Sequence, residues 1–124
     1  MDINKIKSGL QMQNLHFSDI QFERNKIIED GDFGVNISKD IKEIGEHKYT
    51  VSVCVNIDKS DFSLYVKAQA DFIYHGDFKQ EQAIVNTNTI AIIFPYVRSQ
   101  VTLITSQPDM QPILLPAINT SKLK

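Results

Sequence analysis

The chain has 124 residues and a mass of 14.1 kDa, with 42% hydrophobic and 23% charged residues, which is enough for one domain with a single core and too little for two. We therefore expect one domain over residues 1–124. The formal net charge of -2 and the pI near 5.9 exclude the strongly basic composition typical of nucleic-acid-binding proteins, so nucleic acid is not an expected partner.

The chain carries one cysteine and no long apolar run. Cys54 alone can form neither an intramolecular disulfide nor a cysteine-based structural zinc site. No run approaches the roughly 18 consecutive apolar residues of a membrane span, and the N-terminus lacks the apolar centre of a signal peptide. These features predict a cytoplasmic protein in a reducing compartment, without membrane insertion.

The first predicted element, Leu10–Arg24, has an irregular apolar pattern. The positions of its apolar residues switch from even to odd numbers and back to even along the chain: Leu10, Met12, Leu15, Phe17, Ile20 and Phe22. A flat strand with one buried face keeps a single parity. Either bulges reset the register, or the strand is covered on both faces, which would require another subunit.

Three further strands are predicted, because apolar and polar residues alternate with a period of two. The first has apolar residues at Phe33, Val35, Ile37 and Ile41. The second places Tyr49, Val51, Val53, Val55 and Ile57 on one face, and the third Phe62, Leu64, Val66, Ala68, Ala70, Phe72 and Tyr74. Turns at Gly45-Glu46 and at residues 58–61 would join neighbours as hairpins, so an antiparallel meander is expected.

The apolar period becomes helical after Gln82. Six residues share one stripe at about 100° per residue: Ile90, Ile93, Phe94, Val97, Val101 and Ile104. The opposite side of the same helix carries a second stripe: Ile92, Tyr96, Ser99 and Leu103. A helix that is apolar on two faces is usually buried on both. We therefore predict that the first stripe packs on the sheet and that the second is an interface between copies of the chain.

Pro95 bears on where this helix starts. Proline breaks a bond in a helix interior but is favoured in the first turn, so we expect the regular helix to begin at Pro95, with Ile90–Phe94 as a less regular lead-in. For an earlier start, the candidate caps are Asn86, Asn88 and Thr89.

A tail follows the helix, in which Pro108, Pro112 and Pro116 predict extended backbone. Its apolar residues are expected to pack on the sheet or on a neighbouring subunit: Ile113, Leu114, Leu115 and Ile118. The predicted fold is α+β, with a four-stranded antiparallel meander sheet packed by a C-terminal helix and an extended proline-containing tail.

The polar residues do not predict catalysis. His16, His47 and His75 include no pair at metal-ligand spacing and lie beside polar strand residues, so we expect solvated histidines. Cys54 has no nearby base in the sequence, and no nucleotide-binding or nucleophile motif of the glycine-rich kinds occurs. We predict no enzymatic activity, no cofactor and no metal.

Two strings in the C-terminal half, IIFPYVRSQVTLI and PILLPAIN, follow the predicted strands in this order. With the N-terminal string LQMQNLHFSDIQFE they resemble SecB, the tetrameric chaperone of bacterial protein export, over residues 10 to 119. The resemblance implies dimers that pair into tetramers, with helices between the sheets, and apolar grooves that bind unfolded polypeptides or preproteins without ATP. The family continues into a second helix and a mobile tail, so the resemblance implies a shortened member.

The resemblance also assigns roles to residues. Asp19 and Glu23 match two acids of the surface that meets the translocation ATPase, whereas a third acid would fall at Tyr65, where the charge is missing. The client-binding groove would be lined by Leu64, Val66, Phe72, Tyr74, Leu114 and Leu115. For the strand residues of this set, packing in the core is the alternative.

Two other functions remain open. Shortened relatives of SecB include chaperones dedicated to toxin and antitoxin pairs, so the resemblance leaves an adaptor of an antitoxin, or of another single unstable partner, as the alternative to a general holdase. A small-ligand binder or enzyme on the same curved sheet ranks last, and a closed pocket with convergent polar groups would favour it.

Overall fold

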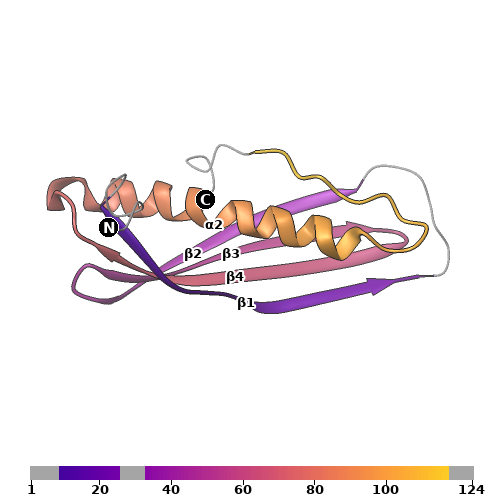
Figure 1. Ribbon diagram of the computed structural model, residues 1–124, viewed down its shortest axis with the longest axis horizontal. Helices are drawn as coiled ribbons and strands as arrows, with labels where there is room; N and C mark the ends of the chain where they lie inside the picture. The colour runs from indigo at the N-terminus through magenta and orange to yellow at the C-terminus, as the bar shows by residue number, and fades with distance from the viewer. Residues whose placement is uncertain (1–8, 26–32, 118–124) are drawn as a thin grey trace.

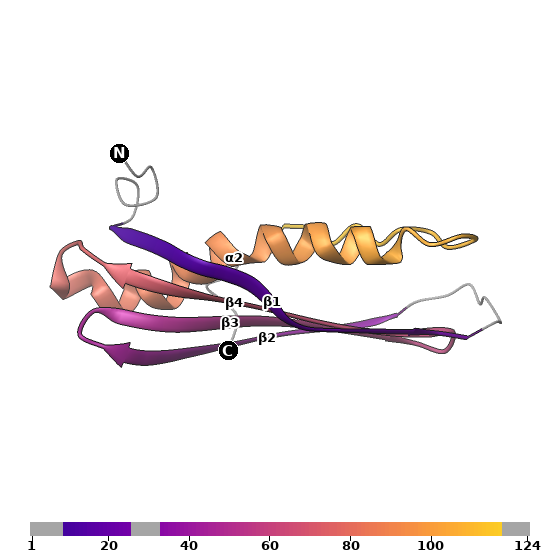
Figure 2. The same ribbon diagram turned by 60° about the horizontal axis from the view of Figure 1, so that its bottom comes forward.

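The computed structural model describes residues 9–25 and 33–117, which form one antiparallel sheet with a long helix on one face (Figure 1). The elements are β1 (Leu10–Arg24), β2 (Gly34–Gly45), β3 (Lys48–Lys59), β4 (Phe62–Tyr74), the short 3-10 helix η1 (Phe78–Gln80) and α2 (Glu81–Thr105). Figure 2 shows α2 on one side of the sheet and no other described element on the opposite side. The predicted α+β class is confirmed.

The strand order is β1-β4-β3-β2, so the predicted meander is right for β2, β3 and β4 and wrong for β1. Tight turns join β2 to β3 and β3 to β4. Residues 25–33, in contrast, separate β1 from β2, and a connection of this length lets the two strands take opposite edges of the sheet. β1 and β2 are therefore the two edge strands.

β1 contains two bulges, which explain its changing parity. The register with β4 shifts between Gln13 and His16 and again between Phe17 and Asp19, and Asn14 at the first shift has a φ of 57°. Before, between and after the shifts, apolar residues pair with the helix-facing side of β4: Met12 with Phe72, Phe17 with Ala68, and Ile20 with Val66. The bulge alternative is confirmed, because each extra residue returns the apolar side chains to the helix side.

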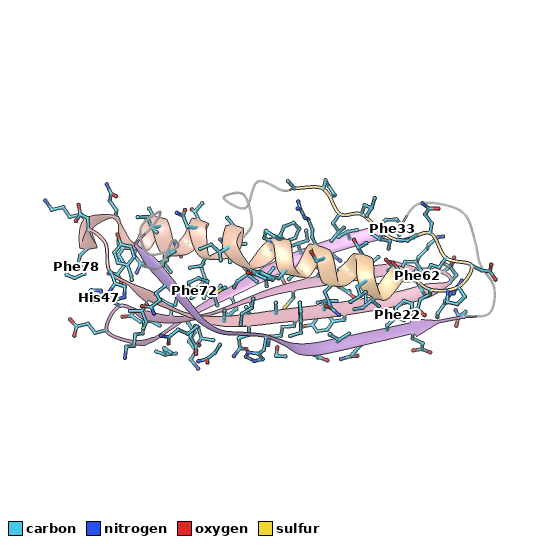
Figure 3. All side chains as sticks on the ribbon, viewed as in Figure 1. Phe22, Phe33, His47, Phe62, Phe72 and Phe78 are labelled. Carbon is cyan, nitrogen blue, oxygen red and sulfur yellow. The ribbon has the colours of Figure 1, made fainter. Side chains whose placement is uncertain are left out.

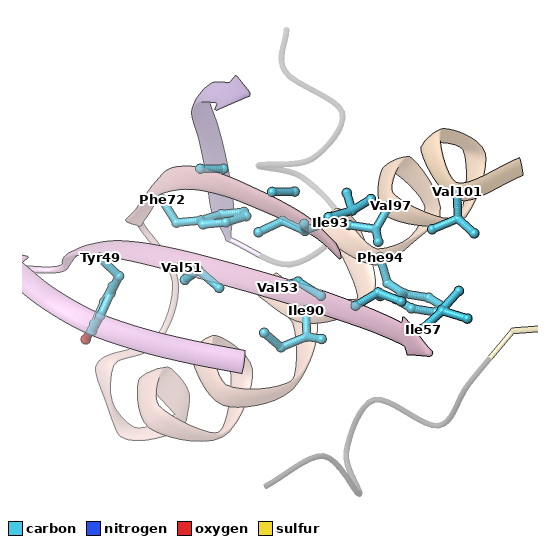
Figure 4. Packing of buried hydrophobic residues seen from close by; sticks show 14 of the residues in the cluster. Tyr49, Val51, Val53, Ile57, Phe72, Ile90, Ile93, Phe94, Val97 and Val101 are labelled. Atoms are coloured by element: carbon cyan, nitrogen blue, oxygen red, sulfur yellow. The ribbon is translucent and has the colours of Figure 1, made fainter. Parts of the chain in front are cut away.

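The core lies between α2 and the two central strands, β3 and β4 (Figure 4). The predicted inward faces of both strands are buried. From α2 the first stripe enters the same core, with five of its members buried: Ile90, Ile93, Phe94, Val97 and Val101. Each such side chain contributes about 1.5–3 kcal/mol through burial, so this layer supplies most of the packing energy of the fold.

α2 begins at Glu81, and the prediction of a start at Pro95 is wrong. Pro95 lies inside the helix on its exposed side, where water can satisfy the carbonyl of Ala91 that loses its partner. The predicted caps Asn86, Asn88 and Thr89 lie within the helix. The chain turns into η1 instead, where the Asp77 carboxylate accepts from the backbone N–H of Lys79 at 3.0 Å.

The second stripe of α2 faces away from the sheet, as predicted. Tyr96 is 47% exposed and Leu103 66% exposed. Ser99 is also exposed, and Ile92 is half-buried. The stripe is thus apolar surface on a single chain, and its role as an interface between copies stays a prediction.

The tail 106–117 lies along the C-terminal half of α2, fixed by hydrogen bonds to the helix. The Ile113 N–H donates to Thr105 Oγ1 at 2.8 Å, and its carbonyl accepts from Thr102 Oγ1 at 2.8 Å. The Ile113 side chain is buried, as predicted, while Leu114 is 78% exposed. Ile118 and Asn119, the end of the PILLPAIN string, lie outside the described residues.

Arg24, the last residue of β1, fixes the turn at the start of the tail. Its guanidinium donates to the carbonyl oxygen of Pro108 at 2.6 Å and to that of Asp109 at 2.8 Å. The Asp109 backbone has a φ of 56°, a left-handed conformation that a tight turn requires. The tail therefore has two fixed points, one on β1 and one on α2.

Candidate functional site

A groove of about 650 Å³ opens between the start of β2 and the tail. Phe33 and Val35 form one wall, and the tail from Asp109 to Pro116 forms the other. The β3–β4 turn contributes Lys59, Asp61 and Phe62. Figure 3 shows Phe33 and Phe62 near the tail, at the opposite end of the molecule from His47.

The walls of this groove are apolar and exposed. Phe33 is 40% exposed, Val35 36% and Leu114 78%. Within residues 9–25 and 33–117, no strand pairs with the outer edge of β2, and an edge of this kind presents backbone N–H and C=O groups to which an extended chain can add. An edge strand beside an apolar wall is an arrangement to which an extended apolar peptide can add.

Two opposite charges lie at the floor of the groove. Lys59 Nζ is 3.5 Å from Asp61 Oδ1, and their side chains are 14% and 7% exposed. Because the two charges neutralise each other, the floor presents little net charge to a bound chain. Asp109 of the tail is the other charged residue among those that line the groove.

The predicted groove residues fall into two groups. Leu64, Val66, Phe72 and Tyr74 are no more than 2% exposed and lie under α2 in the core. Leu114 and Leu115, the tail residues of the set, do line the groove. A client would reach the four strand residues only if α2 moved off the sheet, so their contact with clients stays a prediction.

Sequence reasoning missed the other wall of the groove. Phe33 and Val35 were assigned to a strand but not to a site. The missing information was the strand order, because β2 is an edge strand whose start leaves Phe33 and Val35 exposed, while Ile37 and Ile41 pack against the core. No local pattern in the sequence marks β2 as an edge strand.

Asp19 and Glu23 lie on the outer face of the sheet, opposite Lys67 and Ser63 of β4. The Asp19 carboxylate accepts from the Gln21 amide at 3.1 Å. The structure thus brings the two acids together on one face, and their role in binding an ATPase stays a prediction.

Tyr65 pairs with Gln21, at the position between these two acids. Its phenol donates to Cys54 Sγ at 3.4 Å. This hydrogen bond, with burial, raises the pKa of Tyr65 to about 12. Cys54 is therefore a hydrogen-bond acceptor in the outer face.

His47 does not have the solvated position that was predicted for the three histidines. Its ring stacks on Phe78 with centroids 4.1 Å apart, and its Nδ1 lies 2.5 Å from Glu81 Oε1. The Tyr49 hydroxyl donates to the other Glu81 oxygen. Burial, then this hydrogen bond, raises the pKa of Tyr49. The network joins the first residue of α2 to the β2–β3 turn.

The other two histidines, His16 and His75, are exposed as predicted. Over residues 9–25 and 33–117, no group of three or more histidine, cysteine, aspartate or glutamate side chains is placed to hold a metal ion.

No helix in the described part of the chain combines the length and the apolar character that crossing a membrane requires.

None of the protein-family models that were compared matches the chain. An uncharacterized protein of Methanocaldococcus jannaschii is 28% identical over 127 residues, which covers 93% of this chain and 82% of that protein. A SecB-like chaperone of Mycobacterium tuberculosis, solved in complex with a peptide from the HigA1 antitoxin, aligns with a TM-score of 0.71 at 14% identity, over 93% of this chain and 94% of that one. A Streptococcus agalactiae protein of unknown function aligns with a TM-score of 0.48 at 10% identity, over 87% of this chain and 97% of that one.

The alignment to the mycobacterial chaperone establishes a shared fold. It includes nearly all of both chains, so the four-stranded antiparallel sheet and the C-terminal helix correspond as a unit. The chain has the SecB-like fold, and the resemblance stated from the sequence is confirmed at this level.

Proposed function

We propose that this protein is an ATP-independent chaperone that holds extended apolar segments of unfolded polypeptides or preproteins in the groove between β2 and the tail. The observation that carries the proposal is the apolar groove of about 650 Å³ beside the edge of β2, with which no described strand pairs on that side. The shared fold with a chaperone that was solved with a bound peptide supports it. Holding a chain needs no bond chemistry, so the proposed role is not enzymatic, and the proposed place of action is the cytoplasm.

Two kinds of contact would hold the client. Backbone hydrogen bonds to the β2 edge bind any extended chain, and the apolar walls take side chains without reading a strict sequence. Each buried apolar side chain gives about 1.5–3 kcal/mol, and immobilising it costs about 0.5–1.5 kcal/mol. A few such side chains leave binding in the micromolar to millimolar range, which permits release without ATP.

We expect the protein to suppress client aggregation less well when the walls of the groove become polar. In the double variant V35S/L114S we expect the amount of protein needed to suppress aggregation of a guanidine-diluted client to rise about tenfold, because two apolar contacts of the client are lost. Light scattering at stoichiometric and higher amounts measures this. The variant I44S is the matched control, since Ile44 is 53% exposed on the same strand but does not line the groove. A wild-type protein that suppresses nothing would refute the proposed function, and a fully active double variant would refute the groove as its site.

The alternative is a chaperone dedicated to one antitoxin or similar unstable partner. The observation that favours it is the antitoxin peptide in the mycobacterial structure. Affinity purification from the native host separates the two functions, since a holdase brings down many clients and a dedicated chaperone one dominant protein. The acids Asp19 and Glu23, on the face opposite α2, are the proposed contact with a translocation ATPase if the clients are exported.

We also propose that copies assemble as a dimer or tetramer through the second stripe of α2. Tyr96 and Leu103 are exposed apolar side chains, and Ser99 lines a hollow of about 400 Å³ between α2 and the tail that a partner could fill. We expect the wild-type solution mass, measured by light scattering after gel filtration, to be a multiple of 14.1 kDa. L103E should lower the mass to that of one chain, and Q82E, at an exposed polar position of the same helix, should not. A wild-type monomer at all concentrations would contradict the proposal.

A further inference from the structure

The helix-facing side of β2 carries Lys39 among apolar residues between Val35 and Ile41. The residues on this side pair with buried residues of β3: Val35 with Ile57, Ile37 with Val55, Lys39 with Val53, and Ile41 with Val51. Lys39 therefore takes a position that the period-two pattern would give to an apolar side chain. It is half-buried, whereas Lys42, on the outer side of the strand, is exposed.

Lys39 reaches across from the sheet to the helix. Its Nζ donates to the backbone carbonyl of Asn86 in α2 at 3.1 Å. The ammonium group has three N–H donors, and this bond uses one of them. Val35 is the last β2 residue that lines the groove, and Lys39 lies four residues further along the strand, about 13 Å away. The groove itself ends at Val35, and the β2 edge runs on from it to the Lys39 ammonium group, which is held by the Asn86 carbonyl.

A peptide strand added to the β2 edge would place every second side chain on the helix side. Three such side chains of the peptide, each two residues after the previous one, would lie opposite Val35, Ile37 and Lys39. Directly opposite residues on paired strands interact, favourably when their charges are opposite. An apolar side chain opposite Lys39 would instead remove water from an ammonium group without replacing its hydrogen bonds, which is unfavourable.

We propose that Lys39 is a specificity-determining residue of the peptide site. The favoured ligand is an extended segment with two apolar residues spaced two apart and an acidic residue two positions beyond them, facing Lys39. The inference rests on the proposed function, because it needs a peptide strand on the β2 edge.

The test uses synthetic peptides that differ at one position. Fluorescently labelled peptides carry two leucines spaced two apart and, two residues further on, Glu, Gln or Lys. The set is made in both chain directions, because the added strand can run parallel or antiparallel to β2. We expect the wild-type protein, in fluorescence anisotropy, to bind the Glu peptide of one direction about two- to fivefold more tightly than the Gln peptide, the usual range for a partly exposed ion pair, and the Lys peptide more weakly. High salt should reduce the difference.

Variants of the lysines assign this ranking to one residue. K39M should remove it, K39E should reverse it, and K39R should keep it because the charge is kept. K42M, on the other side of the same strand, is the matched control and should rank the peptides as the wild type does. A folding defect would weaken all peptides alike, so the ranking reports the charge and not the stability.

The outcomes separate the two proposals. Equal wild-type affinity for the Glu, Gln and Lys peptides, or a ranking that survives in K39M, would overturn the role of Lys39 and leave the peptide site standing. A wild-type protein that binds none of the peptides, in either direction, would overturn the proposed function and this inference with it.

Discussion

Replacing Phe72 by alanine should lower the free energy of unfolding by about 3–5 kcal/mol, because it opens a cavity in the layer between the sheet and α2. Phe72 has no exposed surface. Its neighbours across the sheet are Tyr49 on β3 and Met12 on β1, so the ring is enclosed by three strands and the helix. A domain of this size has about 5–15 kcal/mol of stability in total, and the F72A variant should be only marginally folded.

Urea unfolding followed by circular dichroism measures this loss as a lower midpoint at constant slope. F33A is the matched control: Phe33 is 40% exposed, and truncating it should change the free energy of unfolding by no more than about 1 kcal/mol. A loss below about 1.5 kcal/mol in F72A would mean that the core between α2 and β4 is not packed as described.

Replacing Glu81 by alanine should lower the free energy of unfolding by about 2–4 kcal/mol. The Glu81 carboxylate is the acceptor for the buried Tyr49 hydroxyl and the partner of His47 Nδ1. Removing it leaves a buried donor unpaired, which costs more than the net worth of the hydrogen bond. E46A is the matched control, since the Glu46 side chain is 90% exposed and lies 3.6 Å from the other nitrogen of His47. Equal stability of the two variants would contradict the network.

The same network makes stability depend on alkaline pH. The folded protein holds the pKa of Tyr49 above its ordinary value, through burial and then the hydrogen bond to Glu81. The neutral phenol therefore contributes stability that is complete below about pH 10, the ordinary tyrosine pKa, and is lost as the pH rises above it because the unfolded chain releases the proton first. Urea unfolding at pH 8 and pH 11 should show a smaller fall for Y49F than for the wild type. An equal fall would show that Tyr49 does not contribute.

The central strands could be predicted from the sequence because one physical rule decides them. The helix-facing sides of β3 and β4 are covered by α2, so every second residue of both strands is buried and apolar, with Ile73 as an apolar residue on the outer face of β4. The bulges of β1 could be read as one of two alternatives from the parity of its apolar residues, and the stripe of α2 at Ile90, Ile93 and Val97 followed from the helical period. In each of these cases local spacing carries the information.

The strand order and the helix start could not be predicted in the same way. The pairing of β1 with β4 joins the first and the last strand in the sequence, and no local pattern encodes it. At Pro95 the general rule against interior proline failed, because α2 keeps this position on its exposed side and binds the core on both sides of it along the chain. The core contacts of Val85 and Ile90 outweigh one lost backbone hydrogen bond.

The candidate groove depends on the strand order in the same way. The resemblance to SecB places Leu114 and Leu115 in a groove, but Phe33 and Val35 become its other wall only because β2 is at an edge. Lys39 carried no prediction from the sequence, because its position depends on the carbonyl of Asn86 in a distant helix. Sites built from distant segments need the fold before they can be recognised.

The two walls of the groove have a consequence for the time at which the protein becomes active. One wall is translated before the other, because Phe33 and Val35 precede β3, β4 and α2 in the chain, whereas the tail follows α2. A nascent chain whose tail is still inside the exit tunnel has a sheet and a helix but lacks the second wall of the groove. Client capture in the proposed groove would then begin only after the tail has left the tunnel and made its hydrogen bonds to β1 and α2.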